Sequence, residues 1–432
     1  MTETVQNGTR YGQVKAPASK SAAHRLLITA ALSKEPAKVY CDTMSDDITA
    51  TMDCLSALGA TFTVGDGVIA VEPVKAKTKD TQKALSDCPR ALPCKESGST
   101  LRFLMPVAAA LGADVTFVME GKLPNRPHGA LTGELQRHGV SVTQEGNLLK
   151  LSGQLMAGGY TLPGAISSQF ISGLLFALPM LSGDSTLTIT GKRESVSYIT
   201  MTEQAVSEAG IVFEKTDCGY RIPGGQCYKA PKETVVEGDW SGAAFPLVAG
   251  AFSKQGIMVT GLRQDSCQGD RRILTILRDF GAEVVENETS VLVRSGNLKG
   301  QRIDASEIPD LVPVLAVLGA GSDGETVIEH AERLRMKESD RLQTTTAMLS
   351  ALSADITETA DGLLIRGGKQ LHGGNTDSAK DHRIAMSAAV AAGLTDGPVR
   401  ISDAQCAAKS YPSFFTDYNS LTIENNEEKG ER

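Results

Sequence analysis

The sequence has few of the features that mark membrane proteins, secreted proteins or nucleic-acid-binding proteins. Its most apolar stretches, residues 101–111 and 173–181, are too short to cross a bilayer, and each contains a proline. There is no run of basic residues, the formal net charge is −8 and the isoelectric point is near 5.4. We therefore expect no signal peptide, no membrane partner and no nucleic-acid partner, so any anionic ligand must meet a local cluster of cations.

Cysteine is sparse and scattered, with no C-x-x-C pair and no cluster of histidine and cysteine. This spacing is typical of reduced thiols in a cytoplasmic protein and argues against a zinc site. The remaining composition is ordinary: 432 residues, 41% hydrophobic and 5% aromatic, can build two or three domains with separate cores. The thiols belong to Cys41, Cys54, Cys88, Cys94, Cys218, Cys227, Cys267 and Cys406.

The stretch from Pro17 to Leu27, P-A-S-K-S-A-A-H-R-L-L, leads from a loop into a helix rich in alanine and leucine. Ser19 or Ser21 is a suitable N-cap, and the unpaired N–H groups of a helix start attract anions. Lys20 at this point predicts an anion site, and Ser21 and Arg25 share one face of the helix because they stand four residues apart. An ordinary capped helix with solvated cations would look the same, and only repetition along the chain argues against it.

Two sequence patterns alternate along the chain at a spacing of about 70 residues. The first is a helix rich in small residues, a Gly or Ser turn and a β-branched strand, at residues 26–40, 104–119, 174–190, 243–260, 311–329 and 384–401. The second is a helix followed by two short strands around a polar turn, at residues 55–71, 135–151, 205–222, 277–293 and 349–365. These second helices end where a left-handed residue is favoured, at Gly59, Gly139, Gly210, Gly281 and Ser353. The chain therefore predicts an α/β protein of six similar units.

The ends of the chain suggest how the six units divide. The sixth unit ends near residues 411–421 without its two short strands, whereas the N-terminus offers a hairpin at Thr4–Lys15 that turns at Asn7-Gly8. We expect this hairpin to complete the sixth unit. The chain would then form two similar domains of three units each, residues 19–237 and residues 1–18 with 238–432. The connections would cross near residues 17–20 and 237–240, where we expect a hinge.

A polar cluster that a core does not need precedes each small-residue helix. N-capping explains the Ser, Thr and Asp residues, but it does not explain Lys20, Arg102, Gln169 or Arg383 so close to helix starts. The clusters are S-K-S at 19–21, E-S-G-S-T-L-R at 96–102, S-S-Q at 167–169, G-D-W-S at 238–241, I-P-D at 308–310 and D-H-R at 381–383.

Three further cationic stretches lie outside that pattern: N-R-P at 125–127, R-M-K-E-S-D-R at 335–341 and A-K-S-Y-P at 408–412. In the second, Lys337 and Arg341 are one helical turn apart, with Glu338 beside them, although a solvated charge run would look similar. Arginine suits a flat carboxylate, lysine suits phosphate, and a neighbouring carboxylate can move protons. The set predicts substrates that carry both phosphate and carboxylate groups.

In these motifs the sequence resembles the enolpyruvyl transferases, most closely the 5-enolpyruvylshikimate-3-phosphate synthases. The motifs P-A-S-K-S-A-A-H-R, S-G-S-T-L-R, N-R-P, I-S-S-Q-F, R-M-K-E-S-D-R, D-H-R-I-A-M and A-K-S-Y-P occur in family order over nearly the whole chain. The resemblance implies two domains, each an inside-out α/β barrel of three βαβαββ units. It also implies an enzyme of the shikimate pathway, which leads to chorismate and the aromatic amino acids.

The implied reaction transfers the enolpyruvyl group of phosphoenolpyruvate to the 5-hydroxyl of shikimate 3-phosphate through a tetrahedral intermediate and releases phosphate. It needs no metal or organic cofactor, and we expect a monomer. The resemblance places shikimate 3-phosphate on Lys20, Ser21, Arg25, Ser167, Ser168, Gln169, Ser195, Tyr198, Asp310 and Lys337. It places phosphoenolpyruvate on Lys20, Gly98, Arg126, Gln169, Glu338, Arg341, Arg383 and Lys409.

Three positions depart from the family pattern: Ala18 replaces a usual glycine, Glu96 stands where many relatives have asparagine, and Arg333 where some have asparagine. They leave open the role of Arg333 and the response to inhibitors that mimic phosphoenolpyruvate. The alternative within the family is the sister enzyme that uses UDP-N-acetylglucosamine. That enzyme carries a loop cysteine five residues before an R-P pair, whereas this chain has Gly121. A non-catalytic anion-binding repeat protein is the alternative from another class.

For the mechanism, we expect Asp310 to be the base for the hydroxyl, and Glu338 and Lys20 to be candidates for giving a proton to the methylene carbon and removing one later. The sequence leaves the assignment among these three open. The expected site draws cations from both halves of the chain, Lys20 and Arg126 from one and Lys409 among those from the other. We therefore expect shikimate 3-phosphate to favour a closed form in which phosphoenolpyruvate binds better.

Overall fold

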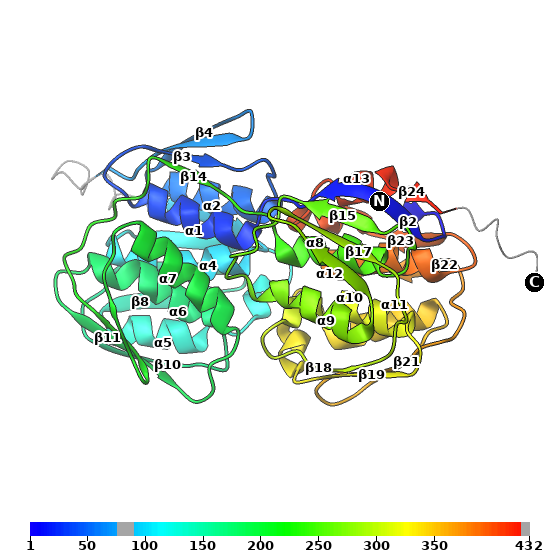
Figure 1. The fold of residues 1–432 in the computed structure, drawn as a ribbon. Helices are drawn as coiled ribbons and strands as arrows, with labels where there is room; N and C mark the ends of the chain where they lie inside the picture. Colours follow the sequence, from blue (N-terminus) through cyan, green and yellow to red (C-terminus); the bar gives the residue numbers. More distant parts are fainter. Residues whose placement is uncertain (76–89, 425–432) are drawn as a thin grey trace, which may run out of the picture. The chain divides into compact units, whose positions relative to one another are not determined.

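The computed structural model describes residues 1–75 and 90–424, so Cys88 lies outside the described residues. The chain divides into two compact units (Figure 1). The middle unit is Lys20–Val236, and the terminal unit combines Met1–Ser19 with Glu237–Arg432. Within the described ranges, no helix is both long enough and apolar enough to cross a membrane.

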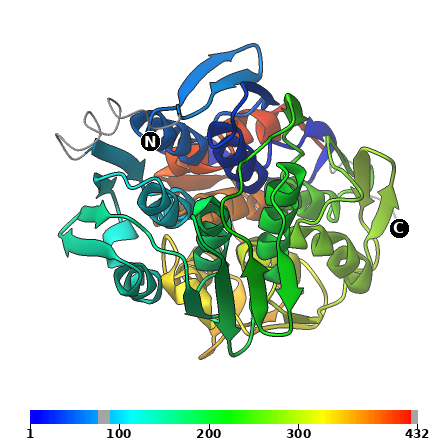
Figure 2. The same ribbon diagram turned by 90° about the vertical axis from the view of Figure 1, so that its left-hand side faces the viewer.

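The middle unit contains three four-stranded sheets, which stand around its helices in Figure 2. In each sheet the first two strands in spatial order are parallel and the others are antiparallel. The spatial orders are β14 (Glu233–Val235), β3 (Ala37–Tyr40), β5 (Val68–Glu72) and β4 (Thr61–Gly65); β6 (Arg90–Lys95), β7 (Val115–Met119), β9 (Leu148–Gly153) and β8 (Val140–Glu145); and β10 (Gly159–Pro163), β11 (Ser185–Thr190), β13 (Gly219–Ile222) and β12 (Glu214–Thr216). The first sheet thus takes its outer strand from the end of the unit.

Two kinds of helix cover these sheets. The helices α1 (Lys20–Ala31), α4 (Gly98–Ala110) and α6 (Ser168–Ala177) are buried on most of their circumference; α4 and α6 are apolar nearly all round, whereas α1 also buries His24 and Arg25. The helices α2 (Asp46–Ala57), α5 (Gly129–Arg137) and α7 (Val196–Glu208) keep exposed faces. The buried helices begin with the polar clusters, so the fold places ligand-type residues at the ends of its most buried helices.

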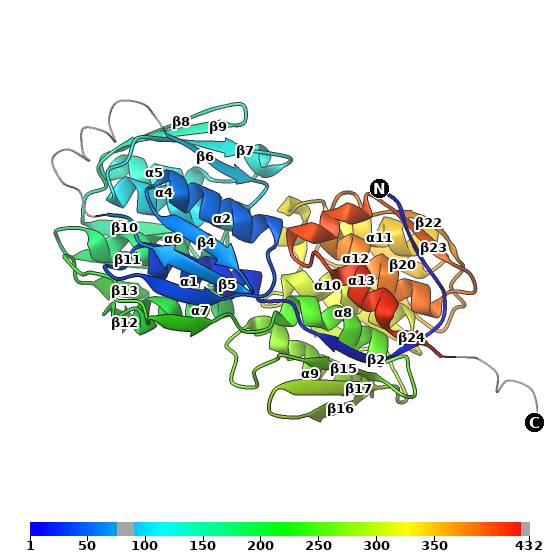
Figure 3. The same cartoon turned by 90° about the horizontal axis from the view of Figure 1, so that it is seen from above.

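The terminal unit repeats this design (Figure 3). Its inner helices are α8 (Trp240–Gly250), α10 (Val312–Ala320) and α12 (His382–Ala391), in which every residue is buried. The outer helices are α9 (Ile273–Phe280) and α11 (Arg341–Ala351), and α13 (Phe414–Ser420) follows the last unit. The sheets run β16 (Glu283–Glu286), β17 (Ser290–Arg294), β15 (Ile257–Thr260), β2 (Arg10–Lys15) and β24 (Thr422–Ile423); β18 (Arg302–Asp304), β19 (Glu325–Glu329), β21 (Leu363–Arg366) and β20 (Asp355–Glu358); and β1 (Glu3–Val5), β23 (Val399–Ser402) and β22 (Gly374–Asp377).

The two recurring patterns are confirmed as helix-and-strand units in all their positions. The residues that end the second helices adopt the left-handed backbone conformation that the sequence predicted. Their φ angles are +111° at Gly59, +93° at Gly139, +79° at Gly210, +100° at Gly281 and +68° at Ser353.

The predicted N-terminal hairpin is wrong. β1 pairs with β23 in the sixth sheet, and β2 pairs with β15 and β24 in the fourth, so the two strands enter different sheets. Gly8 does turn with φ +105°, but the turn leads from one sheet to the next. A turn signal predicts where the chain changes direction, whereas the partner of a strand depends on the packing of the whole unit.

The predicted single helix through Lys337 and Arg341 is also wrong. A short 3₁₀ helix, η5 (Glu332–Met336), ends before Lys337, whose backbone is extended, and α11 begins at Arg341. Asp340 caps α11 by accepting a hydrogen bond from the backbone N–H of Gln343 at 3.2 Å. Because Asp340 is the N-cap, α11 begins after it and does not include Lys337.

Candidate active site

Lys20 is the first residue of α1, and its Nζ lies 2.9 Å from Oδ2 of Asp47 in the first turn of α2. Ser21 follows on the same helix start and remains half-buried. The predicted anion-binding element is thus a helix N-terminus with a lysine, and a carboxylate that the sequence analysis did not single out holds that lysine. Asp47 could have been suspected from its place at a capped helix start, Ser45-Asp46-Asp47.

Arg25 joins two of the predicted substrate-binding segments. Its guanidinium donates to the carbonyl oxygen of Ser21 at 2.6 Å, the carbonyl oxygen of Tyr198 at 2.7 Å and Oγ1 of Thr202 at 2.8 Å. Arg25 is only 3% exposed, so these bonds anchor α7 to α1. The geometry shows Arg25 holding Tyr198 in place, and its direct contact with a substrate stays a prediction.

Gly98 is the first residue of α4 and lies against Arg126. A Cβ atom at Gly98 would stand 2.9 Å from Nη1 and 3.3 Å from Cζ of Arg126. Glycine at this position therefore lets the guanidinium approach the helix N-terminus closely, where its charge and the backbone N–H groups can address the same anion.

Gln169 links the starts of α4 and α6. Its Oε1 accepts from Nη1 of Arg102 at 2.7 Å, and its Nε2 donates to Oγ of Ser99 at 2.8 Å. Arg102 also donates to the carbonyl oxygen of Pro127 at 3.4 Å. Ser167 caps α6 and Ser168 is its first residue, so the S-S-Q motif and the N-R-P motif are held by one polar network.

Ser195 adopts a left-handed conformation, with φ +54° and ψ +45°, at the start of α7. A residue with a side chain rarely adopts this conformation, and such strain is concentrated at functional sites. The predicted substrate role of Ser195 gains an independent argument from its backbone.

In the terminal unit, Arg341 is the centre of a charged network. Its Nε lies 2.8 Å from Oδ2 of Asp381, its Nη1 lies 2.8 Å from Oδ1 of Asp310, and its Nη2 lies 2.9 Å from Oε2 of Glu338. Arg341 is 1% exposed. Burial lowers the pKa of its guanidinium, but the three carboxylates outweigh burial and raise the pKa above its ordinary value.

Asp310 accepts hydrogen bonds on both oxygens, because Oδ2 also lies 2.9 Å from Nη2 of Arg383. Nζ of Lys337 is 3.8 Å from Oδ1 of the same carboxylate. Burial raises the pKa of Asp310, but the charges of Arg383, Lys337 and Arg341 outweigh it and hold the pKa well below its usual value. Asp310 therefore stays ionised at neutral pH and orients the cations around it.

Lys409 completes the network, with its Nζ 3.6 Å from Oε1 of Glu338. The structure thus brings together all six predicted site residues of the terminal unit, although they come from four separate segments of the chain. They are Asp310, Lys337, Glu338, Arg341, Arg383 and Lys409.

Two carboxylates of this unit were missed as site residues. Asp381 is fully buried and binds Arg341 while it caps α12, although its position in the D-H-R motif was visible. Asp270 accepts from the hydroxyl of Ser241, and burial together with the charge of Asp310 raises its pKa to about 7. Asp270 follows Gln268-Gly269 without a recognisable pattern, so its sequence position carried no signal.

Two of the departures, Arg333 and Glu96, have contacts that the structure shows. Arg333 donates to the carbonyl oxygen of Ser306 at 2.8 Å, which gives it a packing role within the terminal unit. Glu96 lies against Gly121, which has φ +55°, and a Cβ atom at Gly121 would clash with Oε1 of Glu96. A cysteine at position 121 would therefore need both a strained backbone and a displaced Glu96 side chain.

Among the described thiols, Cys406 stands on the same short helix as Lys409 and is partly buried. Cys41, Cys54 and Cys94 are buried, and burial raises their pKa values, to about 11 at Cys41 and about 12 at Cys94. Cys218 and Cys227 are exposed. In residues 1–75 and 90–424 there is no group of three or more His, Cys, Asp or Glu residues that could hold a metal ion.

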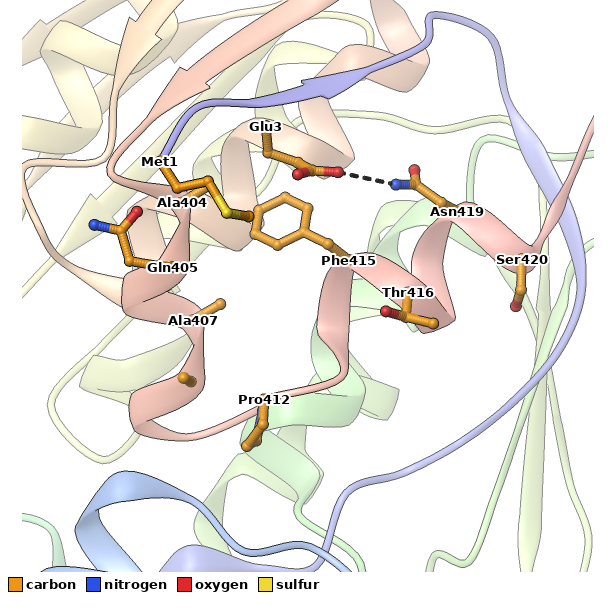
Figure 4. Close-up of a pocket in the computed structure, with 11 residues that line it drawn as sticks. Met1, Glu3, Ala404, Gln405, Ala407, Pro412, Phe415, Thr416, Asn419 and Ser420 are labelled. Atoms are coloured by element: carbon orange, nitrogen blue, oxygen red, sulfur yellow. Dashed lines mark hydrogen bonds between the residues drawn. The ribbon is translucent and has the colours of Figure 1, made fainter.

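A cavity of about 630 Å³ lies in the terminal unit beside η7 (Ala404–Lys409), the short helix that carries Lys409 (Figure 4). Phe415 and Met1 form much of its apolar wall, and Asn419 donates to Glu3 at 3.4 Å on its rim. Its lining in the described chain includes none of the predicted substrate-binding residues.

Comparison with known proteins gives consistent results. Residues 6–418 match the family model described as EPSP synthase (3-phosphoshikimate 1-carboxyvinyltransferase). The chain is 43% identical over 415 residues to a 3-phosphoshikimate 1-carboxyvinyltransferase of Clostridium kluyveri, with 95% of each chain covered. It is 42% identical over 416 residues to the enzyme of that name from Clostridium perfringens, with 95% of this chain and 96% of the relative covered.

The fold agrees with solved structures. EPSP synthase from Acinetobacter baumannii superposes with a TM-score of 0.80 at 26% identity, covering 98% of this chain and 99% of that one. The enolpyruvyl transferase NikO from Streptomyces tendae shares the fold with a TM-score of 0.77 at 16% identity. The predicted inside-out barrel architecture is therefore confirmed.

Proposed function

The chain belongs to the EPSP synthase family, and from that premise we propose that it transfers the enolpyruvyl group of phosphoenolpyruvate to the 5-hydroxyl of shikimate 3-phosphate and releases phosphate. The observation that carries this proposal is the family match over residues 6–418. Gly121 supports it against the UDP-N-acetylglucosamine alternative, because the backbone and Glu96 disfavour a cysteine there. The terminal network supports it against a passive anion-binding repeat, because three carboxylates stand among its cations.

We propose that the two substrates use the residues that the sequence analysis assigned to them. In the middle unit, Lys20, Ser21, Gln169 and Ser195 would bind shikimate 3-phosphate, and Gly98 with Arg126 would bind the phosphate of phosphoenolpyruvate at the start of α4. In the terminal unit, Lys409 would add charge to that phosphate, and Arg383 would bind the carboxylate. Arginine is suited to the planar carboxylate, and lysine to the phosphate as a point charge.

In the proposed chemistry, the 5-hydroxyl adds to C2 of phosphoenolpyruvate while the methylene carbon gains a proton. The adduct then loses a proton from the new methyl group and expels phosphate, which takes up the proton released by the hydroxyl, so the proton count balances. Asp310 is held ionised by its cations, so it is always able to accept the hydroxyl proton, although its low pKa makes it a weak base. Glu338 lies between Arg341 and Lys409, and Lys20 lies beside Asp47, so each candidate for proton transfer is held by an oppositely charged neighbour.

Much of the rate would come from fixed electrostatics, because buried cations held in place before the reaction need no reorganisation as charge moves to the leaving phosphate. The closure of the protein around shikimate 3-phosphate, the monomeric state and the cytoplasmic location stay predictions. Small-angle scattering with and without shikimate 3-phosphate tests the first of them, and an unchanged radius of gyration would count against closure.

The decisive assay for the function is phosphate release from phosphoenolpyruvate. We expect release with shikimate 3-phosphate, together with an enolpyruvyl ether on the 5-oxygen detected by mass spectrometry. UDP-N-acetylglucosamine serves as the control acceptor and should give no release. Release with the nucleotide sugar, or no release with either acceptor, would overturn the proposal.

A further inference from the structure

A continuous chain of buried hydrogen bonds connects three helices of the middle unit. Nδ1 of His24 on α1 lies 2.6 Å from Oγ1 of Thr51 on α2, which lies 2.6 Å from Oγ1 of Thr100 on α4. The hydroxyl of Thr100 then donates to Oγ of Ser97 at 2.7 Å. All four side chains are 0% exposed, so none of these groups is in contact with bulk solvent.

The number of protons available determines which group donates and which accepts in each hydrogen bond of this series. A hydroxyl has one proton to donate, and Thr100 gives its proton to Ser97. The bond between the two threonines must then be donated by Thr51, and the bond between Thr51 and His24 must be donated by Nδ1–H of the imidazole. His24 is therefore the first donor of a one-way series that ends on Ser97.

Ser97 is the N-cap of α4, where its Oγ also accepts from the backbone N–H of Thr100 at 3.3 Å. The series thus runs from the helix that carries Lys20 to the capping residue of the helix that begins at Gly98. Between the described residues, Nε2 of His24 has no hydrogen-bond partner, and the ring meets Phe103 edge-on with centroids 6.3 Å apart.

The imidazole is neutral. Burial lowers the pKa of His24 to about 3, and the remaining influences come from Asp47 on α2, which raises it, and from Lys20 and Arg25 on its own helix, which lower it. At any pH at which the protein works, His24 therefore neither gains nor loses a proton. A histidine this close to Lys20 invites an acid–base role, but its environment excludes that role.

We propose that His24 is a positioning residue that sets the N-terminal turn of α4, through Thr51, Thr100 and Ser97, relative to the N-terminus of α1. This inference rests on the proposed function for the ligands involved. A misplaced α4 start would move Gly98 away from Arg126, which lies within 2.9 Å of the position of a Cβ atom at Gly98. Lys20, Ser21 and Arg25 stay on α1, so phosphoenolpyruvate should suffer more than shikimate 3-phosphate.

The chain offers a rescue and a matched control. In His24→Asn the side-chain amide nitrogen replaces Nδ1 as a donor to Thr51, whereas His24→Leu has a similar size and no donor. Thr51→Val removes the central hydroxyl at nearly constant volume. Ser33→Ala removes a hydroxyl that is also buried, at 4% exposed, and that accepts from the backbone N–H of Ala230 at 2.6 Å beyond the other end of α1.

Steady-state phosphate release gives the KM of each substrate in the wild type and in these variants. We expect His24→Leu and Thr51→Val to raise the KM for phosphoenolpyruvate by about 10-fold or more, roughly one lost hydrogen bond. The KM for shikimate 3-phosphate should change by less than about threefold, because Lys20, Ser21 and Arg25 stay in place on α1 and that substrate loses no hydrogen bond. His24→Asn should lie near the wild type, Ser33→Ala should lose thermal stability without a change in either KM, and the shape of the pH profile should stay the same throughout.

Amide hydrogen exchange tests the inference without turnover, so a failure of the proposed function is recognised separately by an inactive wild type. Exchange in the first turn of α4 should accelerate in His24→Leu and Thr51→Val and stay unchanged in His24→Asn and Ser33→Ala. The inference is overturned if His24→Asn is as impaired as His24→Leu, if both substrates lose affinity equally, or if α4 exchanges at the wild-type rate. A pH profile that loses a limb in His24→Asn would overturn it too, because it would make His24 a proton carrier.

Discussion

In the middle unit, Arg25 donates to two carbonyl oxygens and a hydroxyl, and Arg102 donates to an amide oxygen and a carbonyl oxygen. In the terminal unit, Arg341 instead donates to the carboxylates of Asp381, Asp310 and Glu338. The two units share one architecture and the same placement of polar clusters at helix starts, so the fold does not dictate this difference. We attribute the difference in hydrogen-bond acceptors to different roles of the two sets of cations.

A cation held by neutral oxygens keeps its full charge for a ligand. A cation held by carboxylates is largely neutralised until an anionic ligand competes with those carboxylates for it. Arg25 and Arg102 are therefore suited to attract anionic substrates, although Lys20 of the same unit is paired with Asp47. The terminal unit offers charge and proton acceptors together. The hydrogen bonds of Arg25 and Arg102 should also be insensitive to pH, because carbonyl, amide and hydroxyl oxygens do not titrate near neutral pH, and neither does His24 of the same unit, whose pKa is about 3. The charged arrangement depends on carboxylates that remain ionised.

The largest effect should come from removing the centre of the charged network. Arg341→Met leaves three carboxylates without their shared cation, and we expect a loss of about 3–5 kcal/mol of stability and nearly all activity. Arg25→Met strands neutral oxygens instead, so its loss should be about 1–3 kcal/mol. Urea unfolding of both variants compares the two units directly, and a larger loss for Arg25→Met would contradict the distinction.

A smaller effect should distinguish the two units by the pH dependence of the stability that each contributes. The pKa of Asp270 is raised from 3.8 to about 7 in the folded protein, so between these values the fold retains a proton that the unfolded chain has released. Stability should therefore fall as pH rises from about 4 through 7, by roughly 1–4 kcal/mol at 1.36 kcal/mol per pKa unit. Asp270→Asn keeps an acceptor for the hydroxyl of Ser241 and should flatten this dependence in urea midpoints measured at pH 5 and pH 8.

The urea midpoints at pH 5 and pH 8 can also be measured on a control variant from the middle unit. His24→Asn in the middle unit should leave the pH dependence of the urea midpoint as in the wild type, because the imidazole does not titrate in this range. A slope that survives in Asp270→Asn, or one that disappears in His24→Asn, would contradict the assignment of pH sensitivity to the terminal unit.

The smallest effect should come from the thiols. Cys218→Ser and Cys227→Ser change exposed residues of the middle unit, and we expect no change in activity because no covalent cysteine intermediate is proposed. Phosphate release and circular dichroism check this together. Inactivation with the fold intact would favour the mechanism of the sister enzyme.

The repeat architecture could be predicted from sequence because its signals are local. Helices apolar all round, such as 312–320, mark the buried elements, and glycines such as Gly281 mark helix ends. The partners of the N-terminal strands could not be predicted, since β1 and β2 pair with segments some 250–400 residues away. Strand pairing at that distance is decided by the packed unit rather than by the turn between the strands.

The site residues also divide into those that the sequence predicted and those that it did not. Residue types and motifs pointed to Lys337, Glu338, Arg341 and Lys409, because cations next to a carboxylate are visible in sequence. The partners that set their chemistry were not visible: Asp381 reaches Arg341 from 40 residues away, and the raised pKa of Asp270 arises only from burial and from Asp310. His24, Ser97 and Thr100 of the His24 series stand in two of the quoted motifs, but nothing in the sequence showed that they are linked through Thr51.

The central claim is that cations of both units serve the same substrate. Titration calorimetry of phosphoenolpyruvate in the presence of shikimate 3-phosphate tests it most directly, on Arg126→Ala from the middle unit and Lys409→Ala from the terminal unit. Each variant should weaken phosphoenolpyruvate binding by about 10-fold to 100-fold, since a hydrogen bond to a charged group is worth about 1.5–3 kcal/mol. Binding of shikimate 3-phosphate should be nearly unchanged. A loss in only one of the two variants, or an equal loss for both substrates, would contradict the account.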